Sequence, residues 1–376
     1  MDLSKIREQI DKVDTEIIEA FQKRMRIVDE VTKYKIANNM EVLDAKREKK
    51  VIDNATQKVE NPLIKSYVPS LYSTIMGISR RYQTTLIKKH HEANQTYSAQ
   101  LIKNPKVGYL GIDGSFSYQA LDEYFDHAKH ASYVSFEKVV DAVLSEDIDY
   151  AILPVENTST GNVDAAIDIL AQKNVWILDE YILKVRHNLL GIKGAKPEDI
   201  KKVYSHHQAI RQCDEYLNKN SIFGHIVQST AHGAKLASEE DSKACGAISS
   251  LPCADLYNLE VLKEDIQINQ HNYTRFVVVA KNKHLLIGAN KISVVATLNH
   301  TAGALHELLE IFASNSVNLL KIVSRPIANN PWEYNFHLDF SGNLDDDNVN
   351  KAIDMANETC LDLKVMGCYR AYERVV

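Results

Sequence analysis

The first ninety residues carry their apolar side chains in a heptad pattern with polar residues between them. Apolar positions recur at intervals of three and four residues, with one gap of seven after Ala20: Leu3, Ile6, Ile10, Val13, Ile17, Ala20, Ile27, Val31 and Tyr34. This spacing predicts one long helix with an apolar stripe that faces a partner. A second helix is predicted from near Asp44 toward residue 60, and a third over roughly 70–89 with Pro69 in its first turn. Three helices cannot bury so long a stripe alone, so we expect a dimer.

From residue 106 the pattern changes to short apolar runs that alternate with helical segments. "KVGYLG", "DYAILPVEN", "KKVYS" and "ACGAISS" predict strands, and each is followed by a polar loop and a predicted helix. The alternation indicates an α/β fold with polar motifs at the carboxyl ends of strands. Such loops, including 111–115 and 157–161, are either capped helix starts or parts of a ligand site. Convergence of several of them on one cleft would favour a ligand site.

The last segment, 291–376, has the order β-α-β-β-α-β. "KISVVATL" predicts a strand and "GALHELLEIFASN" a helix, followed by a hairpin, a second helix and the final strand "LDLKVMGCY". This order is ferredoxin-like and is common in regulatory modules that carry out no chemistry themselves.

Two cations interrupt the apolar face of the first predicted helix. Arg24 occupies a stripe position, and Lys35 lies eleven residues later, about 20° away around a helix that turns ~100° per residue. Cations on an apolar face are costly unless an anion meets them. Lys35 lies near the predicted helix end, so its flexible side chain could also extend the ammonium group into water. Other polar side chains share faces of the predicted second and third helices: Asp44 and Glu48 beside Arg47, and Ser79 with Gln83.

Thr274 and Arg275 stand directly ahead of a predicted buried strand, 276–280. Polar residues at the end of a strand often carry small-molecule chemistry. They could equally be a strand edge whose polar side chains meet water.

Composition excludes several classes of protein. No run approaches the ~18 apolar residues of a membrane helix, and the charged N-terminus lacks the core of a signal peptide. The chain has five scattered cysteines without a CxxC pair, which favours reduced thiols in a cytoplasm and argues against zinc. Residues 1–90 hold 18 Lys and Arg against 13 Asp and Glu. Because these charges alternate, a small anionic ligand explains the surplus better than nucleic acid.

Taken in order, the motifs "VENTSTG", "YSHHQ", "NYTRFVV" and "SRP…NPWE" resemble the bifunctional P-protein family, chorismate mutase–prephenate dehydratase. The resemblance spans essentially the whole chain. It implies an all-α three-helix chorismate mutase forming an intertwined dimer over 1–90 and a linker over 91–104. It further implies a periplasmic-binding-protein-like α/β prephenate dehydratase over 105–282 and an α+β ferredoxin-like ACT regulatory domain over 291–370.

The resemblance assigns a chorismate pocket to residues of the helical segment: Arg7, Arg24, Lys35, Asp44, Arg47, Glu48, Ser79 and Gln83. In this family Arg7 would act in the pocket of the dimer partner. Chorismate becomes prephenate by an intramolecular rearrangement, so no nucleophile is needed. Arginines suit the two substrate carboxylates. Lys35 and Gln83 would donate to the ether oxygen as it gains charge, and Glu48 is grouped with them as catalytic.

For prephenate, the resemblance makes Thr274 essential, as a hydrogen-bond donor to the departing hydroxyl. The other binding residues would be Asn157, Ser205, Gln212 and Arg275, with Glu156, Ser115 and Gln208 as weaker candidates. Arg275 would hold a carboxylate or brace the loop. Where the family has His-Pro-Gln this chain has His207 in the middle position, and Ser249-Ser250 and Asn258 also depart from the family pattern.

The resemblance also implies L-phenylalanine as an effector, bound between ACT domains through Gly303, Ala304, Leu305, Ser324, Arg325 and Pro326. His306 and Val323 replace residues of the family motifs, so we expect weakened inhibition. No cofactor or metal is implied. The expected function is synthesis of phenylpyruvate from chorismate by a cytoplasmic homodimer or higher homo-oligomer, without a nucleic-acid or membrane partner. Alternatives are arogenate dehydration and an aromatic-ligand sensor with a degenerate cleft.

Overall fold

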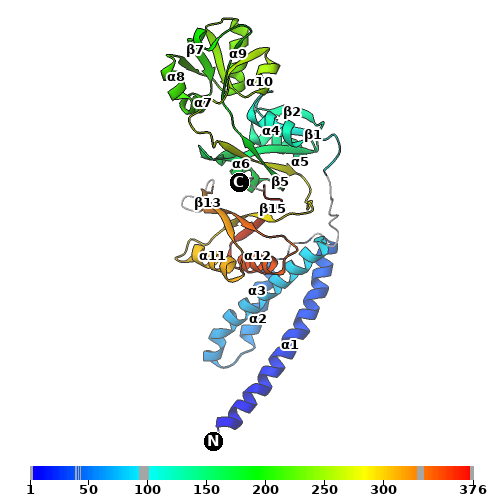
Figure 1. Cartoon of the computed structure of the whole chain (residues 1–376). Coiled ribbons are helices and arrows are strands. Elements are labelled where there is room, and N and C mark those ends of the chain that lie inside the picture. Colours follow the sequence, from blue (N-terminus) through cyan, green and yellow to red (C-terminus); the bar gives the residue numbers. More distant parts are fainter. Residues whose placement is uncertain are drawn as a thin grey trace. The chain divides into compact units, whose positions relative to one another are not determined.

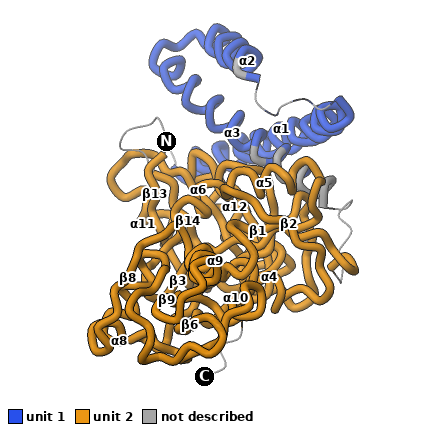
Figure 2. The backbone as a smooth tube through the Cα atoms, turned by 90° about the horizontal axis from the view of Figure 1, so that it is seen from above, with its two compact units in different colours: residues 1–96 blue, residues 97–376 orange. Residues whose placement is uncertain are grey.

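The chain divides into two compact units, residues 1–96 and 97–376 (Figure 2). The structure is a computed structural model that describes residues 3–38, 40, 42, 44–92, 101–327 and 334–372. No described helix is both long and apolar enough to cross a membrane.

The first unit consists of three helices: α1 (Leu3–Ala37), α2 (Ala45–Gln57) and α3 (Pro62–Glu92) (Figure 1). Asp44 caps α2 by accepting a hydrogen bond of 2.9 Å from the Arg47 amide. The third helix begins at Pro62 and not near residue 70, because Asn61 caps it, accepting 2.9 Å from the Leu63 amide. Asparagine as the cap followed by proline is a strong start signal. Pro69 therefore lies inside the helix.

The predicted apolar stripe lies on the surface of α1 when one chain is considered. Leu3, Ile10, Ile17 and Tyr34 are 59%, 53%, 59% and 65% exposed. Only Val28 and Thr32 are buried among the described residues of α1. A stripe of this length exposed to water is typical of an interface that awaits a partner.

The second unit is built around a ten-stranded sheet with the order β13-β14-β12-β15-β5-β11-β3-β1-β2, and β4 pairs with β3. Its amino-terminal half contains β1 (Lys106–Leu110), α4 (Phe116–Tyr124), β2 (Lys129–Tyr133), α5 (Phe136–Leu144), β3 (Tyr150–Asn157), β4 (Gly161–Asn162), α6 (Asp164–Gln172), β5 (Trp176–Lys184) and β11 (Tyr273–Ala280). The strand expected over 276–280 thus begins three residues earlier and includes Thr274 and Arg275.

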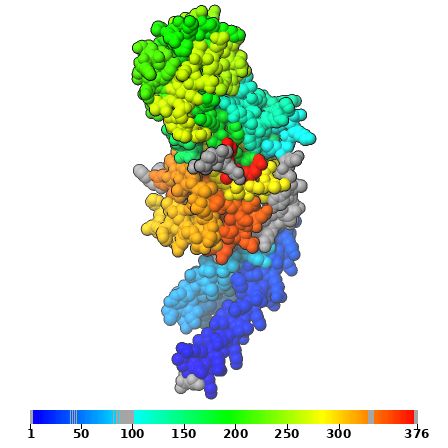
Figure 3. All heavy atoms as spheres, viewed as in Figure 1, coloured from blue at the N-terminus to red at the C-terminus, as the bar shows by residue number. Residues whose placement is uncertain are grey.

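A second lobe, inserted between β5 and β11, has a five-stranded sheet of order β10-β6-β9-β7-β8. It appears in green and yellow-green in the space-filling view (Figure 3). Its elements are β6 (Asn188–Ile192), η1 (Pro197–Asp199), β7 (Lys202–Ser205), α7 (His207–Gln212), α8 (Asp214–Lys219), β8 (Phe223–Ile226), α9 (Thr230–Glu240), β9 (Cys245–Ser249), α10 (Pro252–Leu256) and β10 (Leu259–Lys263). Two short helices, α7 and α8, follow β7 and are separated at Cys213.

The carboxyl-terminal segment confirms the expected β-α-β-β-α-β order. It comprises β12 (Lys291–Thr297), α11 (Ala304–Ser314), β13 (Leu319–Pro326), β14 (Tyr334–Ser341), α12 (Asp347–Thr359) and β15 (Asp362–Tyr369). Strand β15 pairs in parallel with β5 at Gly367 and Ile177. A Cβ at Gly367 would lie 2.4 Å from the Ile177 carbonyl oxygen, so only glycine permits this approach. One apolar core runs through both halves of the sheet, from Val107 to Phe340.

Candidate active sites

In the helical unit, Arg24 of α1 meets α3. Its guanidinium hydrogen-bonds the Ser79 hydroxyl and lies 3.3 Å from the Met76 sulfur. Burial lowers the pKa of Arg24 from its usual value, although an arginine remains charged. Ser79 and Gln83 are buried on the same face of α3, where the Gln83 side-chain amide donates 3.2 Å to the Ser79 carbonyl. The Gln83 carbonyl oxygen is buried without a described partner, so this corner holds unused hydrogen-bonding capacity.

The remaining residues predicted to bind chorismate make contacts of their own, apart from the hydrogen bond between Arg24 and Ser79. Lys35 donates 2.5 Å to the Val42 carbonyl at the turn after α1. Glu48 forms an ion pair with Arg80, a residue that the sequence analysis missed although it adjoins Ser79. Asp44 and Arg47 lie at the exposed start of α2, where Asp44 serves as the cap. Arg7 is exposed on the first turns of α1 and lies about 25 Å along the helix from Arg24, at 1.5 Å per residue.

In the second unit, Thr274 and Asn157 face each other across neighbouring strands. They are paired in the register of β11 and β3, and the Asn157 side-chain amide donates 2.9 Å to the Thr274 hydroxyl. The same amide donates 2.8 Å to the Asn272 side-chain oxygen. The Asn157 oxygen accepts from the amides of Ser159 and Thr160 at 2.9 and 3.0 Å. Asn157 therefore fixes its own loop and the threonine together.

Gln212 and His187 extend this network. The Gln212 side-chain oxygen accepts 3.1 Å from Asn272 and lies 2.7 Å from the ring Nε2 of His187. Burial lowers the pKa of His187, so the ring is neutral at neutral pH and donates to Gln212. Phe116 packs edge-on against that ring, with 5.6 Å between centroids.

A cleft of about 380 Å³ opens beside the network, lined by Thr158, Ser159, Arg211, Gln212, Gln267, Ile268, Asn269 and Asn272. Among the described residues that line the cleft, only Arg211 carries a charge, and the sequence did not predict it as a site residue. The signal was available, since Arg211 immediately precedes Gln212 in a helix that starts at the carboxyl end of a strand. Asn272 was likewise visible in the "NYTRF" motif.

Several predicted prephenate residues have other contacts. Ser205 is buried, and its hydroxyl donates 2.6 Å to the Ile248 carbonyl. Ser115 caps α4 by accepting 3.2 Å from the Tyr118 amide. His207, where the family has proline, is the first residue of α7. Proline is favoured at that position, which explains the family pattern, and histidine leaves the helix start intact.

Arg275 does not reach the cleft. It follows Thr274 in a strand, so its side chain points to the opposite face of the sheet. There it lies 2.7 Å from Asp339 and 3.2 Å from Glu180. Because carboxylates of the protein already surround Arg275, these contacts favour the bracing role over a contact with a substrate carboxylate.

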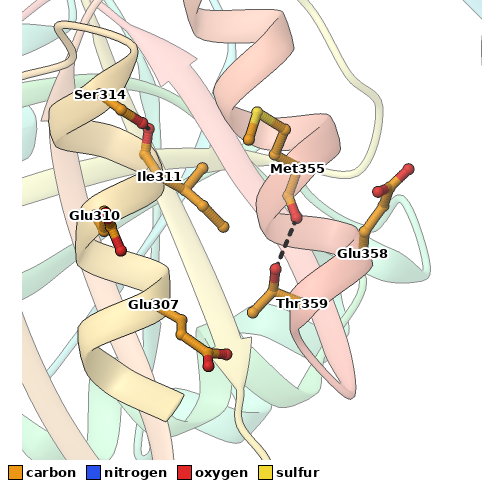
Figure 4. A pocket seen from close by; sticks show the side chains of 7 residues that line it. All are labelled: Glu307, Glu310, Ile311, Ser314, Met355, Glu358 and Thr359. Atoms are coloured by element: carbon orange, nitrogen blue, oxygen red, sulfur yellow. Dashed lines mark hydrogen bonds between the residues drawn. The ribbon is translucent and has the colours of Figure 1, made fainter. Parts of the chain in front are cut away.

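The predicted effector residues lie at the start of α11 and on β13. Gly303 has φ of +89° at the N-cap of α11, a conformation that suits glycine. Arg325 makes a bidentate contact with Asp168, at 2.9 and 2.7 Å. Residues 330–332 of the "NPWE" motif lie outside the described residues. The α11–α12 groove (Figure 4), of about 390 Å³, includes Glu307, Glu310 and Glu358 and does not suit a ligand carboxylate.

Comparison with known proteins identifies both regions. The chorismate mutase type II family matches residues 6–84 and the prephenate dehydratase family matches residues 107–284. The bifunctional chorismate mutase/prephenate dehydratase of Aquifex aeolicus is 30% identical over 371 residues, 98% of each chain. Arogenate dehydratase 2 of Petunia hybrida is 32% identical over 281 residues, 70% of this chain and 71% of that protein.

The crystal structure of the Arthrobacter aurescens prephenate dehydratase in complex with L-Phe superposes with a TM-score of 0.66. The two sequences are 29% identical, and the matched region covers 71% of this chain and 90% of the Arthrobacter chain. This similarity supports the periplasmic-binding-protein-like α/β fold. The chain belongs to the bifunctional chorismate mutase/prephenate dehydratase family: it converts chorismate to prephenate and prephenate to phenylpyruvate in phenylalanine biosynthesis.

Proposed function

We propose that the mutase reaction occurs in a pocket that two copies of the chain complete together. Arg24 and Lys35 lie about 16 Å apart along α1 at 1.5 Å per residue, so their long side chains can hold a substrate between them. Arg7 lies beyond that reach within its own chain. A second copy that covers the exposed stripe of α1 would supply Arg7 and bury the apolar surface in the same step.

Within this pocket the rearrangement needs orientation and charge stabilisation only. Arg24 and Arg47 are assigned to the substrate carboxylates. Lys35 keeps two of its three N–H donors for the ether oxygen while it donates the third to Val42. Gln83 would turn its amide from the Ser79 carbonyl to that oxygen. Fixed donors at a developing negative charge are worth ~10²–10³ in rate. Glu48, paired with Arg80, is assigned to the substrate hydroxyl.

For the dehydratase, the observation that carries the assignment is the hydrogen bond from Asn157 to Thr274. Because the threonine oxygen accepts that bond, its own proton is free for another acceptor. We assign it to the departing ring hydroxyl. The C–O bond breaks, the C–C bond to the ring carboxylate breaks, and the electrons of the latter complete the aromatic ring. Carbon dioxide leaves, and the hydroxyl takes up a proton relayed from solvent through Thr274, leaving as water.

Arg211 is the proposed partner of the prephenate side-chain carboxylate, in place of Arg275. A guanidinium on the cleft wall matches a carboxylate with two parallel N–H donors. The described residues that line the cleft include no Asp or Glu. Arogenate carries an ammonium group where prephenate carries a keto group, and that cation would lack a carboxylate here. The cleft therefore favours prephenate, although the relationship to a Petunia arogenate dehydratase keeps arogenate as the second candidate.

The carboxyl-terminal segment is proposed to be a ferredoxin-like ACT domain that senses phenylalanine. Its strand order β13-β14-β12-β15 fits that fold, and the Arthrobacter relative contains L-Phe. Ala304 and Leu305 begin α11, where free backbone N–H groups attract a carboxylate. All five cysteines are free and buried, which fits a reducing compartment such as the cytoplasm.

The direct test is to supply purified protein with chorismate, prephenate or arogenate and to follow each product separately. We expect turnover of chorismate and prephenate, with kcat/KM for prephenate at least ten-fold above that for arogenate. A preference for arogenate would overturn the substrate assignment. Sedimentation of the active protein as a monomer would overturn the shared mutase pocket.

A further inference from the structure

Strands β3 and β11 carry polar side chains on both faces of the sheet beside the proposed dehydratase site. Thr274 pairs with Asn157 in the register of β11 and β3, and the next pair is Arg275 with Glu156. Successive side chains on a strand point to opposite faces. The first pair lies on the side of Asn272, a residue that lines the cleft and accepts 2.8 Å from the Asn157 side-chain amide. The second pair points the other way, where the Arg275 guanidinium lies 3.6 Å from the Glu156 carboxylate.

That second face is held by the carboxyl-terminal strands. Lys321 of β13 lies 2.7 Å from Glu156, and Asp339 of β14 lies 2.7 Å from Arg275. Glu180 of β5 contacts both Arg275 and Lys291, at 3.2 and 2.8 Å. Asp339 also accepts 2.5 Å from the Ser293 hydroxyl. Three cations thus alternate with three anions in a cluster of Glu156, Glu180, Arg275, Lys291, Lys321 and Asp339, which we name the back-face cluster.

Four members of the back-face cluster are shielded from water, while Lys321 and Glu156 at its edge are 20% and 37% exposed. The side chains of Arg275, Glu180, Asp339 and Lys291 are 14%, 4%, 9% and 9% exposed. Removing one partner from a buried ion pair leaves an uncompensated charge, which forces the neighbours to move or to admit water. Any such movement acts on residues bonded through the backbone to Thr274 and Asn157. A shift of about 1 Å in a catalytic group can cost up to 10²-fold in rate.

Strand β13 connects this cluster to the proposed effector residues. Lys321 and Arg325 lie on one face of β13. Arg325 donates hydrogen bonds to Asp168 of α6, the helix that follows the Asn157 loop. Ser324 and Pro326 lie on the same strand. A displacement of β13 would therefore reach Asn157 through Lys321 and Glu156, and also through Arg325 and α6.

We propose that Glu156 and Arg275 are positioning residues for the dehydratase reaction, and that Lys321 and Asp339 set their place from the carboxyl-terminal domain. The Asn157–Thr274 geometry is then a property of both domains. Effector binding at β13 changes the dehydration rate through the back-face cluster. The regulatory part rests on the proposed phenylalanine site, whereas the positioning part does not.

The test compares Lys321→Met with Lys173→Met. Both remove one lysine from an ion pair of 2.7 Å in the same unit, but the Lys173–Asp141 pair is outside the back-face cluster. We expect Lys321→Met to lower the dehydratase kcat by about three- to ten-fold, within the range for misplaced catalytic groups. KM for prephenate should stay within about two-fold. Lys321→Arg, which keeps the cation, should restore kcat, and mutase turnover in the same samples should not change.

Asp339→Asn provides the second variant, because it removes one charge while it keeps the shape of the side chain. It should lower kcat at least as much as Lys321→Met. Both variants should also weaken phenylalanine inhibition while calorimetry shows retained phenylalanine binding. A purely structural role would lower the melting temperature without separating binding from inhibition.

Wild-type kcat and inhibition in both variants would overturn the proposal, as would equal losses in Lys173→Met. The kcat comparison needs no effector. Failure of the phenylalanine assignment would be seen separately, as the absence of binding to the wild-type protein in calorimetry.

Discussion

The two active-site regions differ in how much of each site a single chain supplies. The proposed dehydratase residues Thr274, Asn157 and Gln212 are joined within one chain by hydrogen bonds that run through Asn272, and Gln212 and Arg211 line the adjoining cleft. The helical unit brings Arg24 to Ser79 but leaves Arg7 about 25 Å away along α1. In the proposed arrangement a single chain forms the dehydratase site, while the mutase site depends on association. Dilution, partner exchange and mutation should affect the two activities differently.

The largest separation should come from Thr274→Ala. This change removes the donor to the departing hydroxyl, and we expect dehydratase kcat to fall by ~10³, the upper value for loss of one donor to a developing charge. Mutase turnover should remain at the wild-type level. Thr274→Ser, which keeps the hydroxyl, serves as the control and should retain most of the activity. Loss of both activities in a folded Thr274→Ala protein would contradict two independent sites.

Lys35→Ala and Arg7→Ala should each lower mutase turnover by ~10²–10³, and neither should affect dehydration of supplied prephenate. If Arg7 acts across the dimer, a mixture of the two variants restores activity. Half of the dimers are then mixed and each has one intact pocket, which gives about a quarter of wild-type turnover.

The measurement requires exchange of chains, through mild denaturation or co-expression, before the assay. The unmixed variants treated in the same way are the controls. Activity that stays at the level of the separate variants, in dimers shown to have exchanged, would mean that Arg7 serves its own chain.

A smaller effect is expected from Arg211→Gln. Loss of a charge-assisted bond to a carboxylate costs ~1.5–3 kcal/mol, so kcat/KM for prephenate should fall by roughly ten- to hundred-fold, mostly through KM. Arg211→Lys should recover part of the loss. Arg275→Lys provides a contrast, because it should act on kcat and leave KM nearly unchanged. An unchanged KM in Arg211→Gln would remove this residue from the substrate site.

The smallest effect concerns inhibition. Val323 lies on β13 between Lys321 and Arg325, on the face of the strand that those two residues share. The double change His306→Val with Val323→Glu places a carboxylate between the two cations and an apolar side chain at the start of α11. We expect phenylalanine inhibition to strengthen a few-fold, at the lower end of effector coupling of ~1–3 kcal/mol. Unchanged or weaker inhibition in the folded double variant would show that these positions do not set it.

The sequence predicted the order of elements well, because periodicity and strand-end motifs are local signals. The heptad stripe located α1, and "VENTSTG" and "NYTRF" placed Asn157 and Thr274 at the ends of strands that prove to be neighbours. The face of the sheet on which Arg275 lies was harder to predict. The apolar pattern places the start of this strand at Phe276, and the alternation of faces predicts the side of Arg275 only when the strand begins at Tyr273.

Other features depended on contacts between distant segments. Nothing local indicates that Arg325 meets Asp168, or that Ser205 bonds to Ile248. The start of α3 is different, because Asn61 and Pro62 carry a start signal in the sequence itself, and Pro69 offers a competing one. Exposure of the stripe on α1 agrees with the expected dimer, whose pairing remains a prediction.

The pairing of β15 with β5 bears on how this protein could be divided or recombined. A chain ending at residue 282 would uncover the edge of β5 and remove the cover from apolar residues such as Trp176, which share a core with β12 and β15. Bare strand edges recruit other chains and promote aggregation. An engineer moving the dehydratase into another protein should therefore cut near residues 96 and 97 and keep the last strands attached.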